Sequence, residues 1–141
     1  MISFRAISAA AIAVSTVPLI MLTAGAASAS PAASHDYRLS RCTARGQYAT
    51  CVTGGTTKND PTSIHVHVKS SKAGEQVYVA WDVTCAKGSG AGSKSGSFTA
   101  NTVVNRKIKM PYTRPDYCIV SADAQLQKGG SWIEVYISYW T

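Results

Sequence analysis

Residues 76–85 read QVYVAWDVTC, and the alternation of apolar and polar side chains in this stretch decides the fold class. Successive side chains of an extended strand point to opposite faces, so alternation with period two predicts a strand with one buried face. The apolar members, every second residue, are Val77, Val79, Trp81, Val83 and Cys85.

The same alternation recurs along the chain between clusters of Gly, Pro, Asn and Ser. Together with residues 76–86, it predicts about seven short strands in an all-β, immunoglobulin-like antiparallel β-sandwich over residues 42–141. The stretch 86–97, AKGSGAGSKSGS, predicts a flexible exposed loop. The six further predicted strands are 47–53, 63–70, 95–100, 103–110, 118–127 and 132–140.

The N-terminus has the pattern of a secretory leader. Arg5 precedes an apolar run, and Ala27-Ser28-Ala29 supplies the small residues that signal peptidase requires. We therefore expect residues 1–29 to be a signal peptide, residues 30–41 a flexible segment, and the mature protein to be secreted, extracellular and without a membrane anchor.

Positive charge dominates the mature chain. Without Arg5, 13 Lys and Arg face 7 Asp and Glu, which favours acidic polymers or acidic proteins as partners. The basic residues are scattered along the sequence. The basic run 105–109, NRKIK, is interpreted as a solvated strand face, so nucleic acid is not an expected partner.

Four cysteines in a small exported chain predict two disulfides, and three pairings are possible in principle. We favour sequential pairing, because Arg45-Gly46 provides a turn within the first short loop. The last two cysteines lie on apolar strand faces, which predicts a disulfide between the sheets with Trp81 packed nearby. The predicted pairs are Cys42–Cys51 and Cys85–Cys118.

The leader, the cysteines and the strand pattern resemble those of small secreted actinobacterial two-disulfide β-sandwich proteins with an immunoglobulin-like architecture. The resemblance covers residues 36–141 and implies a fold, without a family motif. Actinobacterial subtilisin inhibitors are similar in size and in having two sequential disulfides. Their reactive-loop motif, Cys-Pro followed by an apolar residue and Tyr-Asp-Pro, is absent, since Ala-Lys-Gly-Ser follows Cys85.

Catalytic motifs are not found in the sequence. There is no G-x-S-x-G elbow, and Glu75 and Glu134 are the only glutamates. We therefore predict a non-enzymatic binding or interaction module without a cofactor. A small secreted hydrolase or nuclease is the alternative from another class.

The C-terminal strand WIEVYISYW supplies the main candidate for a binding surface. Alternation places Trp132, Tyr136 and Trp140 on the face opposite the core. Aromatic rings on a flat sheet resemble the sugar-stacking platforms of carbohydrate-binding modules, which predicts a carbohydrate or cell-wall polymer as ligand. The alternatives are that other segments cover these rings or that they mediate self-association.

The loop PYTRPD at 111–116, next to Cys118, is the second candidate. A proline-flanked loop held by a disulfide is typical of protease inhibitors, and its inhibitory candidates are Pro111, Tyr112, Thr113 and Arg114. A structural turn is the alternative.

His65 and His67, in SIHVHVK at 63–69, fall on one strand face as a metal-ligand pair would. Lys69 follows on the same face and repels a cation. We therefore predict a solvated strand face and no metal site, with the two histidines as secondary candidates.

Overall fold

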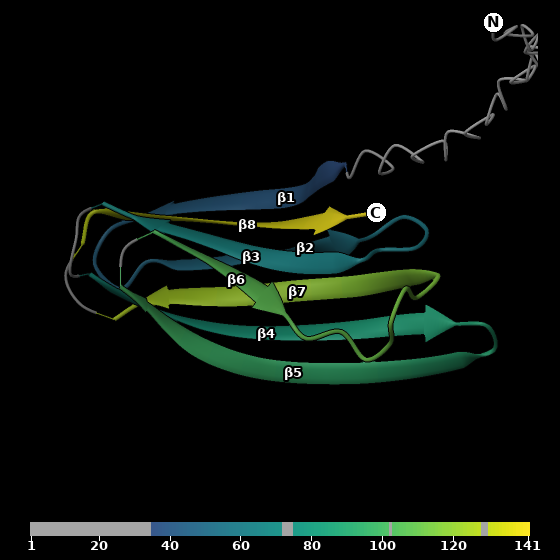
Figure 1. Ribbon diagram of the computed structural model, residues 1–141. Coiled ribbons are helices and arrows are strands. Elements are labelled where there is room, and N and C mark those ends of the chain that lie inside the picture. The colour runs from purple at the N-terminus through teal and green to yellow at the C-terminus, as the bar shows by residue number, and fades with distance from the viewer. Residues whose placement is uncertain (1–34, 72–74, 102, 128–129) are drawn as a thin grey trace, which may run out of the picture. The chain divides into compact units, whose positions relative to one another are not determined.

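Eight strands of the computed structural model form two antiparallel four-stranded sheets that face each other (Figure 1). The structure describes residues 35–71, 75–101, 103–127 and 130–141; the predicted leader lies outside them. One sheet has the order β1-β8-β3-β6 and the other the order β2-β7-β4-β5. The strands are β1 (Asp36–Arg45), β2 (Thr50–Thr56), β3 (Ser63–Ser70), β4 (Gln76–Lys87), β5 (Gly90–Asn101), β6 (Val104–Ile108), β7 (Tyr117–Leu126) and β8 (Trp132–Trp140).

The predicted antiparallel β-sandwich is confirmed. Within that class, eight strands in the orders 1-8-3-6 and 2-7-4-5 form a jelly roll, where about seven strands in an immunoglobulin-like arrangement were expected. No helix in the described part of the chain is long and apolar enough to cross a membrane.

The core lies between the sheets and is built by alternation. Ile64, Val66 and Val68 of β3 are fully buried, while His65 and His67 between them lie half-buried on the outer side. β8 adds Ile133, Val135 and Ile137 to the core in the same way. The burial of these inner residues determines which side chains of β8 and β3 face outward.

β1 corrects the expectation of a flexible segment over 30–41, because residues 36–41 are already part of this strand and pair with β8. Its pairing contains a bulge: Arg38 lies opposite Ser138, whereas Arg41 lies opposite Tyr136. Three steps on β1 thus match two on β8. The extra residue breaks the period of two, and that is why the sequence does not read as a strand here.

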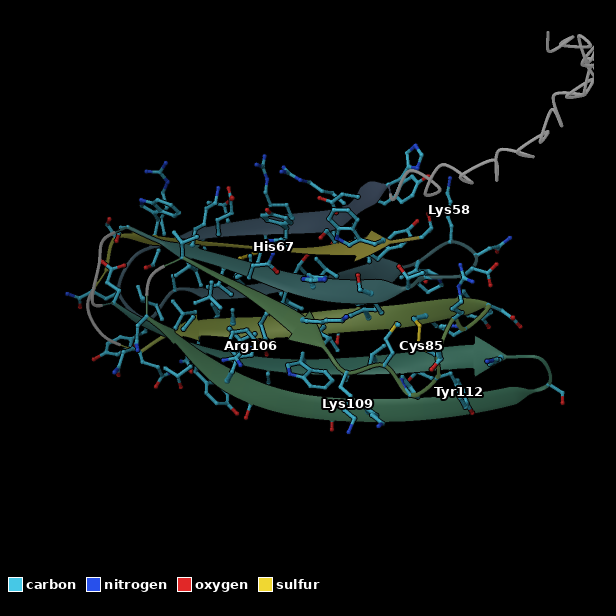
Figure 2. The ribbon with its side chains drawn as sticks, viewed as in Figure 1. Lys58, His67, Cys85, Arg106, Lys109 and Tyr112 are labelled. Atoms are coloured by element: carbon cyan, nitrogen blue, oxygen red, sulfur yellow. A yellow bond between two sulfur atoms is a disulfide. The ribbon has the colours of Figure 1, made fainter. Side chains whose placement is uncertain are left out.

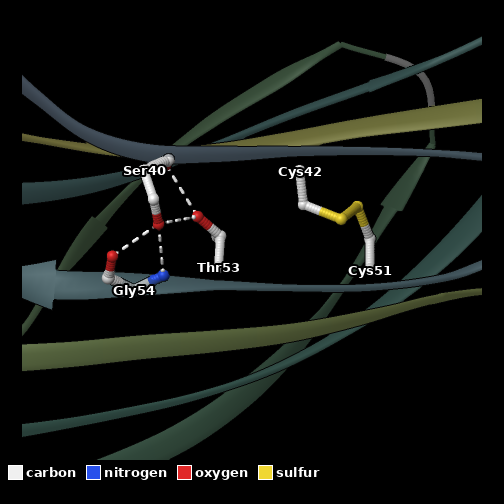
Figure 3. The surroundings of a disulfide bond; sticks show 5 residues. All are labelled: Ser40, Cys42, Cys51, Thr53 and Gly54. Atoms are coloured by element: carbon white, nitrogen blue, oxygen red, sulfur yellow. Dashed lines mark hydrogen bonds between the residues drawn. A yellow bond between two sulfur atoms is a disulfide. The ribbon is translucent and has the colours of Figure 1, made fainter.

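Hydrogen bonds tie this bulge to the other sheet (Figure 3). The Ser40 hydroxyl donates to the carbonyl of Gly54 at 2.5 Å and accepts from the Gly54 amide at 2.9 Å. The Thr53 hydroxyl donates to the Ser40 carbonyl at 2.7 Å. The edge strand β1 is therefore held to β2 as well as to β8.

Both predicted disulfides are present, but the one that joins the two sheets is Cys42–Cys51 and not Cys85–Cys118. Cys42–Cys51 connects β1 to β2 and so joins the two sheets. Cys85 and Cys118 lie directly opposite each other on β4 and β7 of one sheet. The expected bond between the sheets at Cys85 is therefore a cross-strand bond within one sheet.

The predicted loop 86–97 is largely strand: β4 continues to Lys87, and β5 begins at Gly90. Inward-facing glycines explain the low-complexity sequence. A Cβ on Gly96 would lie 2.6 Å from the Trp81 ring, and one on Gly92 would lie 3.0 Å from Tyr112. Aromatic rings thus occupy the space that side chains of β5 would fill, and Trp81 packs on Gly96 across the sheet.

Candidate functional site

The three C-terminal aromatic residues lie on the outer face of the β1-β8-β3-β6 sheet, as alternation predicts, but they are less open than free platforms. Tyr136 is 9% exposed. Trp132 and Trp140 are half-buried near the two ends of β8, about 26 Å apart at the usual rise per strand residue. β8 is flanked by β1 and β3, and side chains from both neighbours cover the middle ring.

Tyr136 is the centre of a stack that spans three strands. The His67 ring lies parallel to the Tyr136 ring, with 4.2 Å between centroids and 7° between planes. The Arg38 guanidinium lies 4.7 Å from the same centroid. His67 and Arg38 come from the strands on opposite sides of β8, so the tyrosine ring lies between a histidine and a cation. Figure 2 shows His67 among the outer side chains.

Each of the two histidines also makes a hydrogen bond. Nδ1 of His65 lies 2.9 Å from Oδ1 of Asn105, and Nε2 of His67 lies 2.8 Å from Oγ of Ser138. The described residues contain no group of three or more His, Cys, Asp or Glu that could hold a metal ion. His65 and His67 therefore each bond a neighbouring polar side chain on the outer surface of the sheet.

His67 is held toward its neutral form. Its burial lowers the pKa below the ordinary value of 6.5, and the nearby charge of His65 lowers it further. Arg38 and Lys69 act in the same direction, whereas Asp36 opposes them. A neutral imidazole suits the stack, because it lies flat on Tyr136 beside an arginine.

The 2.8 Å contact between His67 and Ser138 also has the length required of a nucleophile and its base. Ser138, however, is fully buried by the side chains around it. A substrate carbonyl or phosphate has no access to its hydroxyl. The contact fixes the His67 ring and does not provide an accessible nucleophile.

The structure brings together basic residues that are scattered in the sequence. The outer face of this sheet carries five of them, which the sequence did not single out as a group. We call this surface, with its aromatic residues and histidines, the β8 face. Its basic residues are Arg38, Arg41, Arg45, Lys69 and Lys107.

Two carboxylates lie on the same face. Glu134 is shared between Arg41, at 3.5 Å, and Lys69, at 3.8 Å. Asp36 lies opposite Trp140 at the other end of the sheet. Positive charge therefore remains in excess across the β8 face.

The predicted inhibitory loop 111–116 lies over the end of the other sheet. Pro111 and Tyr112 are half-buried, and both lie close to Gly92 of β5. Thr113 is exposed, but its carbonyl accepts a hydrogen bond from Nζ of Lys87 at 2.9 Å. These contacts give the first half of the loop a packing role.

Arg114 is exposed at the tip of this loop and has a φ of 48°. Proteins that bind an extended peptide segment pair with it as an added strand. A left-handed residue at the tip interrupts that extended backbone. On the far side, Oδ2 of Asp116 accepts from the Gly88 amide at 2.9 Å, which anchors the loop to the β4–β5 turn.

A hollow of about 630 Å³ lies at the end of the sandwich, where the sequence predicted no site. Its lining includes Tyr37 and Tyr117, which are 39% and 44% exposed, together with Lys58 and Asn59. Tyr37 stacks on Tyr139 with 5.2 Å between ring centroids. No alternation signal marks these tyrosines, because they meet only where two strand ends converge.

Fold and surface together describe a two-sheet jelly roll that presents a basic, aromatic outer face. Neither a scan against protein-family models nor a search of curated proteins finds a match for the chain. Among solved structures, that of TmCBM61 in complex with beta-1,4-galactotriose is similar, with a TM-score of 0.43 and 12% identity over 75% of this chain and 68% of that chain. A similarity at this level carries no functional argument.

Proposed function

We propose that this protein is a secreted, non-enzymatic module that binds an extracellular polymer, first of all a cell-wall carbohydrate, across the β8 face. The observation that carries the proposal is the stack of His67, Tyr136 and Arg38 between Trp132 and Trp140. Side chains fixed before binding lose little entropy when a ligand arrives. A sheet face about 26 Å long between two tryptophans suits an extended chain better than a small molecule.

A binding role, rather than catalysis, fits the chemistry of this face. The His67–Ser138 pair has no accessible hydroxyl, and Glu134 is engaged by two basic side chains. The two disulfides indicate an oxidising environment, which agrees with export by the predicted leader.

Retention on insoluble polysaccharides tests the proposal. The protein is expected to bind at least one of cellulose, chitin and purified bacterial cell wall, and Trp132→Ala combined with Trp140→Ala is expected to reduce retention. Tyr78→Ala is the matched control, because Tyr78 is an exposed aromatic residue on the outer face of the other sheet. Absence of retention on every polymer, or equal loss in the control, overturns the proposal.

The protease-inhibitor alternative depends on Arg114, which suits a protease that cleaves after basic residues. The φ of 48° at this residue makes the loop a poorer fit than the sheet face. Incubation with trypsin and subtilisin at a stoichiometric ratio tests this alternative. Both proteases are expected to keep their full activity.

Self-association through the edge of the C-terminal strand is disfavoured, because β8 is paired on both sides by β1 and β3. Self-association through this strand could then occur only through the outward side chains of the β8 face. Sedimentation at increasing protein concentration is expected to find a monomer.

A further inference from the structure

The two outer faces of the sandwich differ in charge. The β8 face carries five basic side chains and two carboxylates. Of the described residues on the outer face of the β2-β7-β4-β5 sheet, Asp82 and Asp123 are the charged ones, and both are acidic. Of the two outer faces, the β8 face is thus the one with an excess of positive charge, which raises the local concentration of polyanions there.

The basic side chains of the β8 face are spread over its width. Arg38 and Arg45 project from β1 at one side of the sheet, and Lys107 projects from β6 at the other. Three inter-strand steps separate β1 from β6, about 14 Å in total. An anionic chain laid across or along the sheet therefore meets a cation at several points.

Some of the basic side chains of the β8 face are not paired with a carboxylate of the described residues and can bind an anionic partner. Glu134 accepts from Arg41 and also lies within ion-pair distance of Lys69. Among the described residues, no carboxylate lies within ion-pair distance of Arg45 or Lys107, and both are exposed. Exposed cations without a fixed partner lose no internal interaction when a polyanion binds.

We propose that the polymer bound by the β8 face is an anionic polysaccharide, whose carboxylate, sulfate or phosphate groups are recognised by Arg38, Arg45 and Lys107. This inference rests on the proposed polymer-binding function and adds the charge of the partner. Arginine suits such groups, since its planar fork of N–H donors matches their oxygen atoms.

The stack argues against a single-stranded nucleic acid as the bound polymer. Sequence-tolerant binding of single strands uses aromatic rings on which successive bases stack. The Tyr136 ring is covered by His67 and Arg38, so its faces are not open to a base. The remaining rings, Trp132 and Trp140, are about 26 Å apart, too far for neighbouring bases.

The test compares dextran sulfate and polygalacturonate with unmodified dextran at low salt. Arg45→Glu combined with Lys107→Glu is expected to weaken binding of the anionic polymers by about tenfold or more. Lys58→Glu combined with Arg114→Glu is the matched control, since it changes the net charge equally at exposed residues outside the β8 face. Binding by the unaltered protein is expected to weaken as salt is added.

Each outcome supports or overturns the inference. Equal weakening in both double variants shows a net-charge effect and overturns it, as does tighter binding of single-stranded DNA than of dextran sulfate at equal charge. Retention on neutral polysaccharides alone overturns the inference and leaves the proposed function standing; retention on none overturns both. If the reversal lowers the melting temperature, Arg45→Gln with Lys107→Gln replaces it.

Discussion

The ring of His67 lies on the ring of Tyr136 with 4.2 Å between centroids, while Nε2 of the histidine lies 2.8 Å from Oγ of Ser138. His67 on β3 is thus held by Tyr136 and Ser138 of the neighbouring strand β8, on the outer surface of the sheet. Arg38 completes the arrangement from the third strand. Because His67 takes part in these contacts, a change in its protonation is expected to change the stability of the fold.

His67 is expected to make stability dependent on pH. Burial lowers its pKa in the folded protein below the 6.5 expected in the unfolded chain, so the unfolded state binds more protons in acid. The contribution is complete above pH 6.5 and is lost as the pH falls below it. Thermal unfolding at pH 7.5 and 5.5 measures the difference, and His67→Gln is expected to reduce it.

His65→Gln serves as the control for this prediction, because His65 lies on the same strand face and bonds Asn105 instead of Ser138. It is expected to retain more of the pH dependence than His67→Gln. A pH dependence unchanged in His67→Gln shows that the loss of stability comes from another group.

The two disulfides are expected to contribute unequally. In the chain-entropy model, the loop closed by Cys42–Cys51, with a separation of 9, accounts for about 3 kcal/mol, and that closed by Cys85–Cys118, with a separation of 33, for about 4 kcal/mol. Pairwise replacement by serine, followed by urea denaturation, measures both. A larger loss at Cys42–Cys51 means that joining the sheets matters more than loop length.

Gly96→Ala is expected to destabilise the protein by about 1–3 kcal/mol, because the new Cβ would lie 2.6 Å from the Trp81 ring. Gly90→Ala on the same strand is the control, since its Cβ would meet its first neighbour at 3.6 Å. Trp81→Leu should make the Gly96→Ala change less costly. Denaturation of the single and double variants measures this coupling, and additive losses contradict the packing of Trp81 on Gly96.

Ser40→Ala is expected to cost about 1–2 kcal/mol, because it removes the hydrogen bonds that tie the bulge of β1 to Gly54. Thr43→Ala is the control, being exposed on the same strand. Hydrogen exchange should show faster exchange along β1 in Ser40→Ala. Unchanged exchange there means that pairing with β8 alone holds the strand.

Strands 63–70 and 132–140 were predicted with their observed bounds because strict alternation marks residues that face a core on one side. The pairing of the cysteines was also predictable, although their distribution over the sheets was not. Sheet membership depends on which strands become neighbours, and a jelly roll places consecutive strands mostly in different sheets.

The β8 face was only partly predictable. Its aromatic residues follow from alternation in one strand, but Arg38 and Arg41 share a face only because of the bulge between them. An odd spacing of three places them on opposite faces of a regular strand. Likewise, the first part of β5 was assigned to a loop, because its inward residues include Gly92 and Gly96, which carry no apolar signal; the part over 95–100 was predicted as a strand.

The outer face of the β2-β7-β4-β5 sheet determines which surface a polymer-bound molecule exposes to the solvent. A protein attached to an anionic polymer through Arg45 and Lys107 turns the β2-β7-β4-β5 sheet toward the solvent. That sheet offers hydroxyl groups, such as those of Ser95 and Ser97 on β5, beside the carboxylates of Asp82 and Asp123. A bound copy would therefore present an acidic, hydroxyl-bearing sheet face to the solvent in place of the polymer that it covers.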